Sequence, residues 1–186
     1  MEVKPRTEEV VSSTTIYSGR VLRYKMARVK LSDGSVHLRE IVEHPGAVAL
    51  IPIFGDQIVL IKQFRLPASR VLYEIPAGTL AKGESPEECA ARELIEETGY
   101  RAGKLRELFH CFLAPGYSTE MIRFYLATEL QFGMQHLDED EAIQICPTPI
   151  ERALDMVHSN EIEDAKTTIG ILLCEQYLAT RKADDC

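Results

Sequence analysis

The chain has 186 residues, with 21 Lys and Arg against 29 Asp and Glu, and a formal net charge of −8. This length suits one globular domain with an additional subdomain, and a hydrophobic fraction of 45% is enough for a packed core. The acidic excess disfavours a protein that binds nucleic acid or an anionic membrane surface, because phosphate contacts need a basic face.

The sequence lacks the marks of a membrane or secreted protein. It contains no run of about 20 apolar residues that could span a membrane, and its start, MEVKPRTEEVV, has no apolar signal-peptide core. Five cysteines are irregularly spaced, without a CxxC pair that would indicate a structural zinc site (Cys89, Cys111, Cys146, Cys174 and Cys186). We therefore expect a cytoplasmic protein with reduced thiols.

The N-terminal part of the chain is predicted to be antiparallel β-structure. Its β-branched or loosely alternating segments predict strands over residues 10–17, 21–31 and 36–43. Asp33-Gly34 between the last two strands is a strong hairpin signal. We expect residues 1–43 to form an N-terminal β subdomain and residues 44–186 to form the main domain.

The main domain is predicted to combine strands with three helices. Strands are predicted over residues 47–54, 57–64, 71–75, 105–113, 121–130 and 142–146, and helices over residues 85–99, 149–158 and 165–180. Ser85 as N-cap, Pro86 in the first helical position and Glu88 in a capping box mark the first helix start, and Gly99 marks its end. This order favours an α+β fold, an α/β/α sandwich with an N-terminal antiparallel β subdomain, over repeated βαβ units.

The first helix carries two groups of carboxylates. Those at its start are favoured by the helix dipole (Glu84, Glu87 and Glu88). Glu93, Glu96 and Glu97 lie near the other end, where the dipole disfavours them, and their spacing places them on one face. Each like-charge pair costs about 0.2–0.5 kcal/mol unless something offsets it. A bound divalent cation would offset the repulsion, and the ordinary alternative is a solvated acidic face.

The spacing of these residues resembles the Nudix box. The pattern G-x5-E-x7-R-E-U-x-E-E-x-G-U, with U a bulky apolar residue, is matched at every defined position by Gly78, Glu84, Arg92-Glu93-Leu94, Glu96-Glu97 and Gly99-Tyr100. The chain is therefore identified as similar to the Nudix hydrolases, which cleave a nucleoside diphosphate linked to another moiety. The resemblance implies a Nudix α/β/α sandwich fold.

The Nudix resemblance also implies a divalent metal site. By resemblance, Glu93 and Glu97 are metal ligands that take part in catalysis, Glu96 is a further ligand, and the backbone carbonyl of Ala77 also coordinates. Hard cations such as Mg²⁺ take oxygen ligands from a few carboxylates and substrate phosphates, and can activate a water. Mg²⁺ is the expected cofactor, with Mn²⁺ and Zn²⁺ as alternatives. We expect Arg92 to orient the carboxylates.

Segments outside the box resemble the ADP-ribose pyrophosphatase branch of the family. Pro115 lies 16 residues after Gly99, as in that branch, although Ala114 replaces the serine that often precedes it. Further similar segments cover residues 39–48, 62–65, 74–78, 138–141 and 164–167. The resemblance implies hydrolysis of ADP-ribose to AMP and ribose 5-phosphate. The alternatives are another nucleoside diphosphate sugar, NADH or an oxidised nucleotide as substrate, or a sensor that binds ADP-ribose without cleaving it.

The branch resemblance assigns further residues by position. Glu139 aligns with the loop glutamate proposed as catalytic base, and Glu141 is the competing candidate. Substrate contacts are expected from Arg20, Arg39, Glu40, Arg65, Gly116 and Glu120. Paired guanidinium donors suit diphosphate oxygens, while an ordinary surface position is the alternative for each arginine.

Two further expectations concern the whole chain. In this branch the N-terminal strands are exchanged across a homodimer, so residues 1–43 are the expected dimerisation region. The negative charge is concentrated in residues 84–97, which sum to −5, and residues 138–141, which sum to −4, so the remainder is nearly neutral. A small diphosphate can still bind, because a metal ion would reverse the local charge.

Overall fold

A computed structural model describes residues 7–137 and 142–184. The chain divides into two compact units, the first made of residues 1–46 and 112–121 and the second of residues 47–111 and 122–186. Both units contain antiparallel strand pairs, and all three helices belong to the second. The predicted α+β fold class is confirmed. None of the helices within the described residues is long and apolar enough to cross a membrane.

The first unit is a three-stranded antiparallel sheet. Its strands pair in the order β1 (Glu8–Ser18), β2 (Arg23–Leu31) and β3 (Val36–Glu43). The predicted turn between β2 and β3 is formed with Gly34 at φ 85°, and the Asp33 carboxylate accepts a hydrogen bond from the Ser35 amide at 2.9 Å. Positive φ is the conformation that glycine adopts without steric cost, which explains the Asp-Gly pair.

A loop from later in the chain is attached to this sheet. The amide of Val42 in β3 donates to the Tyr117 carbonyl at 2.8 Å, and the Thr119 amide donates back to the Val42 carbonyl at 3.0 Å. The Thr119 hydroxyl also accepts from the His44 amide at 2.9 Å. These bonds explain why residues 112–121 belong to the first unit although they lie far away in sequence.

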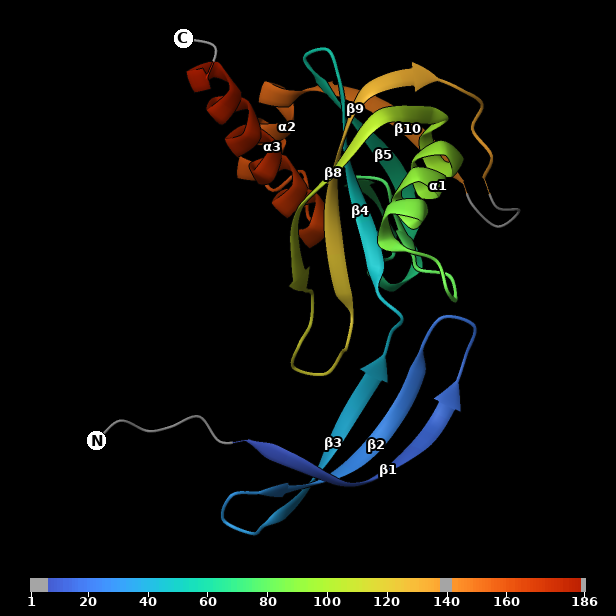
Figure 1. Ribbon diagram of the computed structural model, residues 1–186, viewed down its shortest axis with the longest axis vertical. Coiled ribbons are helices and arrows are strands. Elements are labelled where there is room, and N and C mark those ends of the chain that lie inside the picture. The colour runs from blue at the N-terminus through green and yellow to red at the C-terminus, as the bar shows by residue number, and fades with distance from the viewer. Residues whose placement is uncertain (1–6, 138–141, 185–186) are drawn as a thin grey trace. The chain divides into compact units, whose positions relative to one another are not determined.

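The second unit is built on a seven-stranded mixed sheet. Its strands are β4 (Ala47–Phe54), β5 (Gln57–Arg65), β6 (Arg70–Glu74), β7 (Ala77–Thr79), β8 (Tyr100–Phe112), β9 (Met121–Phe132) and β10 (Ile143–Pro149). The order is β10-β5-β4-β9-β8, with β6 paired to β5 and β7 paired to β4. Helix α1 (Pro86–Thr98) covers one face, and α2 (Ile150–His158) and α3 (Ala165–Asp184) cover the other (Figure 1).

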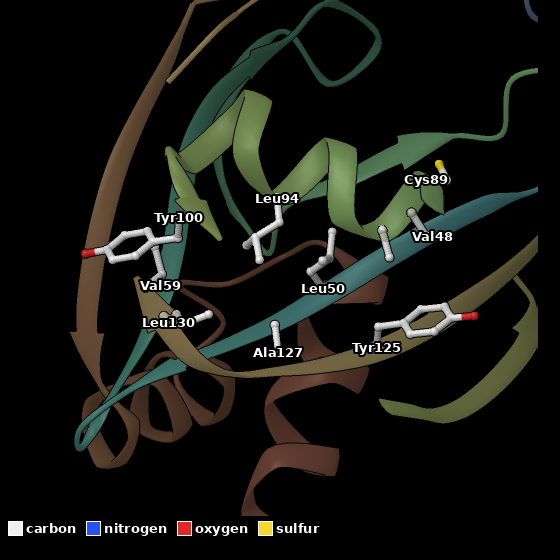
Figure 2. Close-up of a cluster of buried hydrophobic side chains, with 10 residues drawn as sticks. Val48, Leu50, Val59, Cys89, Leu94, Tyr100, Tyr125, Ala127 and Leu130 are labelled. Carbon is white, nitrogen blue, oxygen red and sulfur yellow. The ribbon is translucent and has the colours of Figure 1, made fainter. Parts of the chain in front are cut away.

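Strand β4 is buried on both faces, which explains its continuous apolar sequence. On one face Val48 and Leu50 pack in a cluster with Leu94 of α1 (Figure 2). On the other face α3 approaches closely, because a Cβ added at Gly170 would lie 2.7 Å from Cδ1 of Ile75 and 3.4 Å from Cγ1 of Ile51. Helices pack on both sides of β4, as in the predicted sandwich.

The structure corrects several predicted boundaries. Strand β8 begins at Tyr100 and not at residue 105, because Gly99 ends α1 with φ 72° and turns the chain directly into the strand. Strand β10 continues to Pro149, so α2 begins one residue later than predicted. Prolines are tolerated there because β10 is an edge strand paired only with β5. The short strand β7 was not predicted, and α3 extends beyond residue 180.

Candidate active site

Helix α1 is fixed at both ends by its own sequence. The Ser85 hydroxyl accepts from the Glu88 amide at 3.3 Å, and the Glu88 carboxylate accepts from the Ser85 amide at 2.9 Å, which is the predicted capping box. At the other end the Gly99 amide donates to the Ile95 carbonyl at 2.8 Å. These caps fix where the helix starts and stops, and therefore which side chains face β7.

Glu97 faces the start of β7 from the last turn of α1. Glu97 is only 3% exposed, and its Oε2 accepts a hydrogen bond from the Ala77 amide at 2.9 Å. A buried carboxylate needs such partners, because an unpaired charge in a protein interior is strongly unfavourable. Glu97 is therefore held beside Ala77, whose carbonyl was the fourth expected metal ligand.

Glu93 lies against Gly78, one residue further along β7. A Cβ added at Gly78 would lie 1.8 Å from Cδ and 1.9 Å from Oε1 of Glu93. Gly78 pairs with Val48 of β4, so the strand cannot easily move away. The first glycine of the box is thus required by the close approach of a carboxylate to the backbone.

Arg92 is hydrogen-bonded to the other three carboxylates of the box. It donates from Nε and Nη2 to Glu84 at 2.8 and 3.0 Å, and from Nη1 to Glu93 at 2.6 Å and Glu96 at 2.8 Å. These bonds from Arg92 lower the pKa of Glu84 to about 2, and the carboxylates raise the pKa of Arg92. The orienting role expected of Arg92 agrees with these contacts.

The donor chemistry of this helix face fits a hard divalent cation. Within residues 7–137 and 142–184, no three His, Cys, Asp or Glu side chains converge as a ready-made metal cluster. Glu93 and Glu96 turn to Arg92, and Glu97 turns to the Ala77 amide. The donors are nevertheless all oxygen atoms, as Mg²⁺ prefers, and three carboxylates beside one guanidinium leave the helix face negatively charged. Their roles as metal ligands remain predictions.

The segment that follows β9 is bonded to the end of α1. The Gly133 amide donates to the Gly99 carbonyl at 2.6 Å, the Gln135 side chain to the Glu97 carbonyl at 2.6 Å, and the His136 amide to the Glu96 carbonyl at 3.2 Å. These donors satisfy carbonyls that a helix end leaves unpaired. No local sequence pattern indicated this contact.

Arg65 lies near the same carboxylates. Its Nε and Nη2 donate to Oε1 and Oε2 of Glu74, each at 2.7 Å, and the charge of Glu97 further raises the pKa of Arg65. Lys166 also contacts the carboxylate of Glu74, and Glu74 is 1% exposed. Glu74 and Lys166 were not predicted as site residues, although both lie in segments that resemble the branch.

The other predicted substrate residues lie in the first unit. Arg39 and Glu40 are in β3, Arg20 is exposed in the β1–β2 connection, and Gly116 and Glu120 are in the loop attached to β3. The Arg39 guanidinium donates to the Glu8 carboxylate, with Nε at 3.0 Å from Oε2. Their substrate roles remain predictions. Glu139 and Glu141 lie outside the described residues.

The α/β/α sandwich thus presents the carboxylates of α1 beside the glycine-containing strand β7. Residues 43–168 match the model of the NUDIX domain. The chain belongs to the Nudix family, as the sequence predicted.

The chain is also similar to individual proteins over most of its length. The ADP-ribose pyrophosphatase of Bacillus subtilis (strain 168) is 41% identical over 184 residues, which cover 97% of each chain. The methanol dehydrogenase activator of Bacillus methanolicus is 38% identical over 179 residues and 95% of each chain. A crystal structure of an ADP compounds hydrolase superposes with a TM-score of 0.85 over 97% of this chain and 98% of the other. Because the sequence identity is 22%, this superposition shows a shared fold alone.

Proposed function

We propose that the protein hydrolyses the diphosphate of ADP-ribose, releasing AMP and ribose 5-phosphate. The observation that carries this proposal is the complete box on α1, with Glu93 and Glu97 held against Gly78 and Ala77. It is supported by the 41% identity, along 97% of both chains, to a relative named ADP-ribose pyrophosphatase.

Glu93, Glu96, Glu97 and the Ala77 carbonyl would hold a divalent cation, with Mg²⁺ as the first choice and Mn²⁺ or Zn²⁺ as alternatives. When bound, such a cation neutralises diphosphate charge and activates a water. The chain itself supplies the positions of the donors. Arg92 restrains Glu93 and Glu96, and the Ala77 amide restrains Glu97.

The remaining roles follow from the resemblance to the ADP-ribose pyrophosphatase branch. Arg65 would bind diphosphate oxygens with guanidinium hydrogen-bond donors, because the fork geometry of arginine matches phosphate oxygens. Glu139 would accept the proton of the attacking water, and Glu141 is the alternative base. Further substrate contacts are proposed for Arg20, Arg39, Glu40, Gly116 and Glu120.

We also propose that the protein is a cytoplasmic homodimer that associates through its first unit. Strand β1 is exposed along its whole length, including Val10, Ile16 and Tyr17 at 55–61% exposure. Apolar side chains in such number on a small sheet favour burial against a partner, and the proposed partner is a second copy of this chain.

The substrate proposal is tested by following AMP release from ADP-ribose with Mg²⁺, Mn²⁺ or Zn²⁺, with product identification. The same panel contains another nucleoside diphosphate sugar, NADH and an oxidised nucleotide. Fast, metal-dependent release of AMP and ribose 5-phosphate is expected. If ADP-ribose is not cleaved while another panel member is cleaved fast, the substrate assignment is wrong.

A Glu97→Gln variant distinguishes an enzyme from a sensor that only binds. Glutamine can still accept the hydrogen bond from the Ala77 amide but loses the charge, so the fold should persist while turnover falls on the order of 100-fold. Glu87→Gln, in the exposed first turn of the same helix, is the matched control and should retain wild-type turnover. Equal turnover of both variants would contradict the assigned role of Glu97.

A further inference from the structure

A buried carboxylate lies between two cations next to the proposed metal centre. Glu74, at the end of β6, is 1% exposed and receives hydrogen bonds from Arg65 and from Nζ of Lys166. Burial opposes the charge of Glu74, but the two cations outweigh this effect and lower its pKa below the ordinary value. Glu74 is therefore an ionised anchor inside the fold.

Lys166 is itself firmly placed at the start of α3. Its side chain is 12% exposed, and Nζ also donates to Oδ2 of Asp164 at 3.0 Å. The same Asp164 oxygen accepts from the Thr167 amide at 2.9 Å, and the Thr167 hydroxyl accepts from the Ile75 amide at 2.9 Å. The α3 start is thus bonded to the segment that leads from Glu74 into β7.

One edge of the Arg65 guanidinium is hydrogen-bonded to Glu74, and its other edge makes no hydrogen bond to the described residues. Among the described residues, its guanidinium donates only through Nε and Nη2, and both bonds go to the carboxylate of Glu74. The Arg65 side chain is 39% exposed, and the charge of Glu97 acts on it. Nη1 is therefore available to bind a ligand, and the nearby charge of Glu97 belongs to a proposed metal ligand on α1.

We propose that Lys166 is a positioning residue that orients Arg65 towards the diphosphate through Glu74. Lys166 fixes Oε2 of Glu74, and the two carboxylate oxygens fix the plane of the Arg65 guanidinium. A guanidinium held in plane loses less freedom when it binds phosphate oxygens. This proposal rests on the proposed function, because it requires an anionic diphosphate ligand.

The proposal is tested by ligand binding without turnover. The dissociation constant of ADP-ribose is measured in EDTA for the wild type, Lys166→Met, Lys166→Arg and the exposed control Lys104→Met. We expect about tenfold weaker binding for Lys166→Met, partial recovery for Lys166→Arg and no change for Lys104→Met. Unchanged binding by Lys166→Met would overturn the positioning role.

A double-mutant cycle tests whether Lys166 acts through Arg65. In an Arg65→Gln background, Lys166→Met should weaken ADP-ribose binding no further, because the oriented group is already absent. An equal loss in both backgrounds would overturn the proposal and assign Lys166 a direct or purely structural role. Binding of ADP-ribose by the wild type in EDTA is measured first, and its absence overturns this inference. The proposed function is tested separately by AMP release in the presence of metal.

The Glu74→Gln, Lys166→Met double variant separates positioning from stability. It removes one negative and one positive charge, so the net charge of the buried site is unchanged. Its melting temperature should therefore be closer to that of the wild type than the melting temperature of Lys166→Met alone. Binding of ADP-ribose should remain weak, because a neutral amide holds the guanidinium less firmly. Recovery of both melting temperature and binding would show a structural role alone and overturn the inference.

Discussion

Gly78 is a functional residue because of what lies against it. The Glu93 carboxylate occupies the position that a Cβ would take, at 1.8 to 2.3 Å from its atoms. A Gly78→Ala substitution is expected to displace Glu93 and lower kcat/KM on the order of 100-fold, since small misplacements of reacting groups have effects of this size. Steady-state kinetics with ADP-ribose measure the loss. A variant with wild-type kcat/KM would refute the assigned role of Glu93.

Stability against acid should depend on Glu84. Its pKa in the folded protein is about 2, below the ordinary 4.5, because Arg92 donates two hydrogen bonds to it. A lowered pKa adds stability that is complete above pH 4.5 and is lost as the pH falls towards 2. The stability difference between wild type and Glu84→Gln should therefore shrink over this range in metal-free denaturant titrations. A pH-independent difference would contradict this account.

At the scale of elements, the capping box should control the stability of α1. Ser85→Ala removes the hydroxyl that accepts from the Glu88 amide, and is expected to lower the free energy of unfolding by about 1 kcal/mol. Ser85→Asp keeps an acceptor at the N-cap and is the matched control, with near wild-type stability. Urea unfolding followed by circular dichroism gives both values. Equal losses would mean that the cap hydrogen bond is not the cause.

Elements with local signals were the ones that the sequence predicted well. The caps of α1, the Asp33-Gly34 turn and the strand periods depend on residues close in sequence. Strand β7 is only three residues long and exists because β4 pairs with it, which no local pattern reveals. Likewise, the second partner of Glu74 besides Arg65 is Lys166, which lies 92 positions after Glu74 in the sequence.

The site residues divide in the same way. Helical spacing predicted that Glu93 and Glu97 share a face, and the Nudix resemblance predicted that Arg92 orients the carboxylates. It could not predict that Gly78 is covered by Glu93, or that Gln135 donates to the Glu97 carbonyl, because these depend on how strands return to the helix. Arg39 was expected at the substrate, and in the structure its guanidinium is paired with Glu8.

At the scale of the whole molecule, the exposed β1 predicts association. We expect light scattering after size exclusion to give about twice the 20.9 kDa chain mass, since the sheet leaves Val10, Ile16 and Tyr17 exposed. Ile16→Glu should shift the protein towards the monomer, and Thr14→Glu, at an exposed polar position of the same strand, is the control for added charge. A wild-type monomer at micromolar concentration would refute the dimer.

The parallel pairing of β4 with β9 also governs how the chain is made. Ala47 lies opposite Ile122, so a strand completed early in synthesis must wait for about 75 further residues before its partner emerges. During that time β5 and β7 can pair with β4, but the edge of β4 that pairs with β9 has no native neighbour. An unpaired strand edge is prone to pair with other chains. The central strand of the finished sheet is therefore open to mispairing in the nascent chain until β9 has been made.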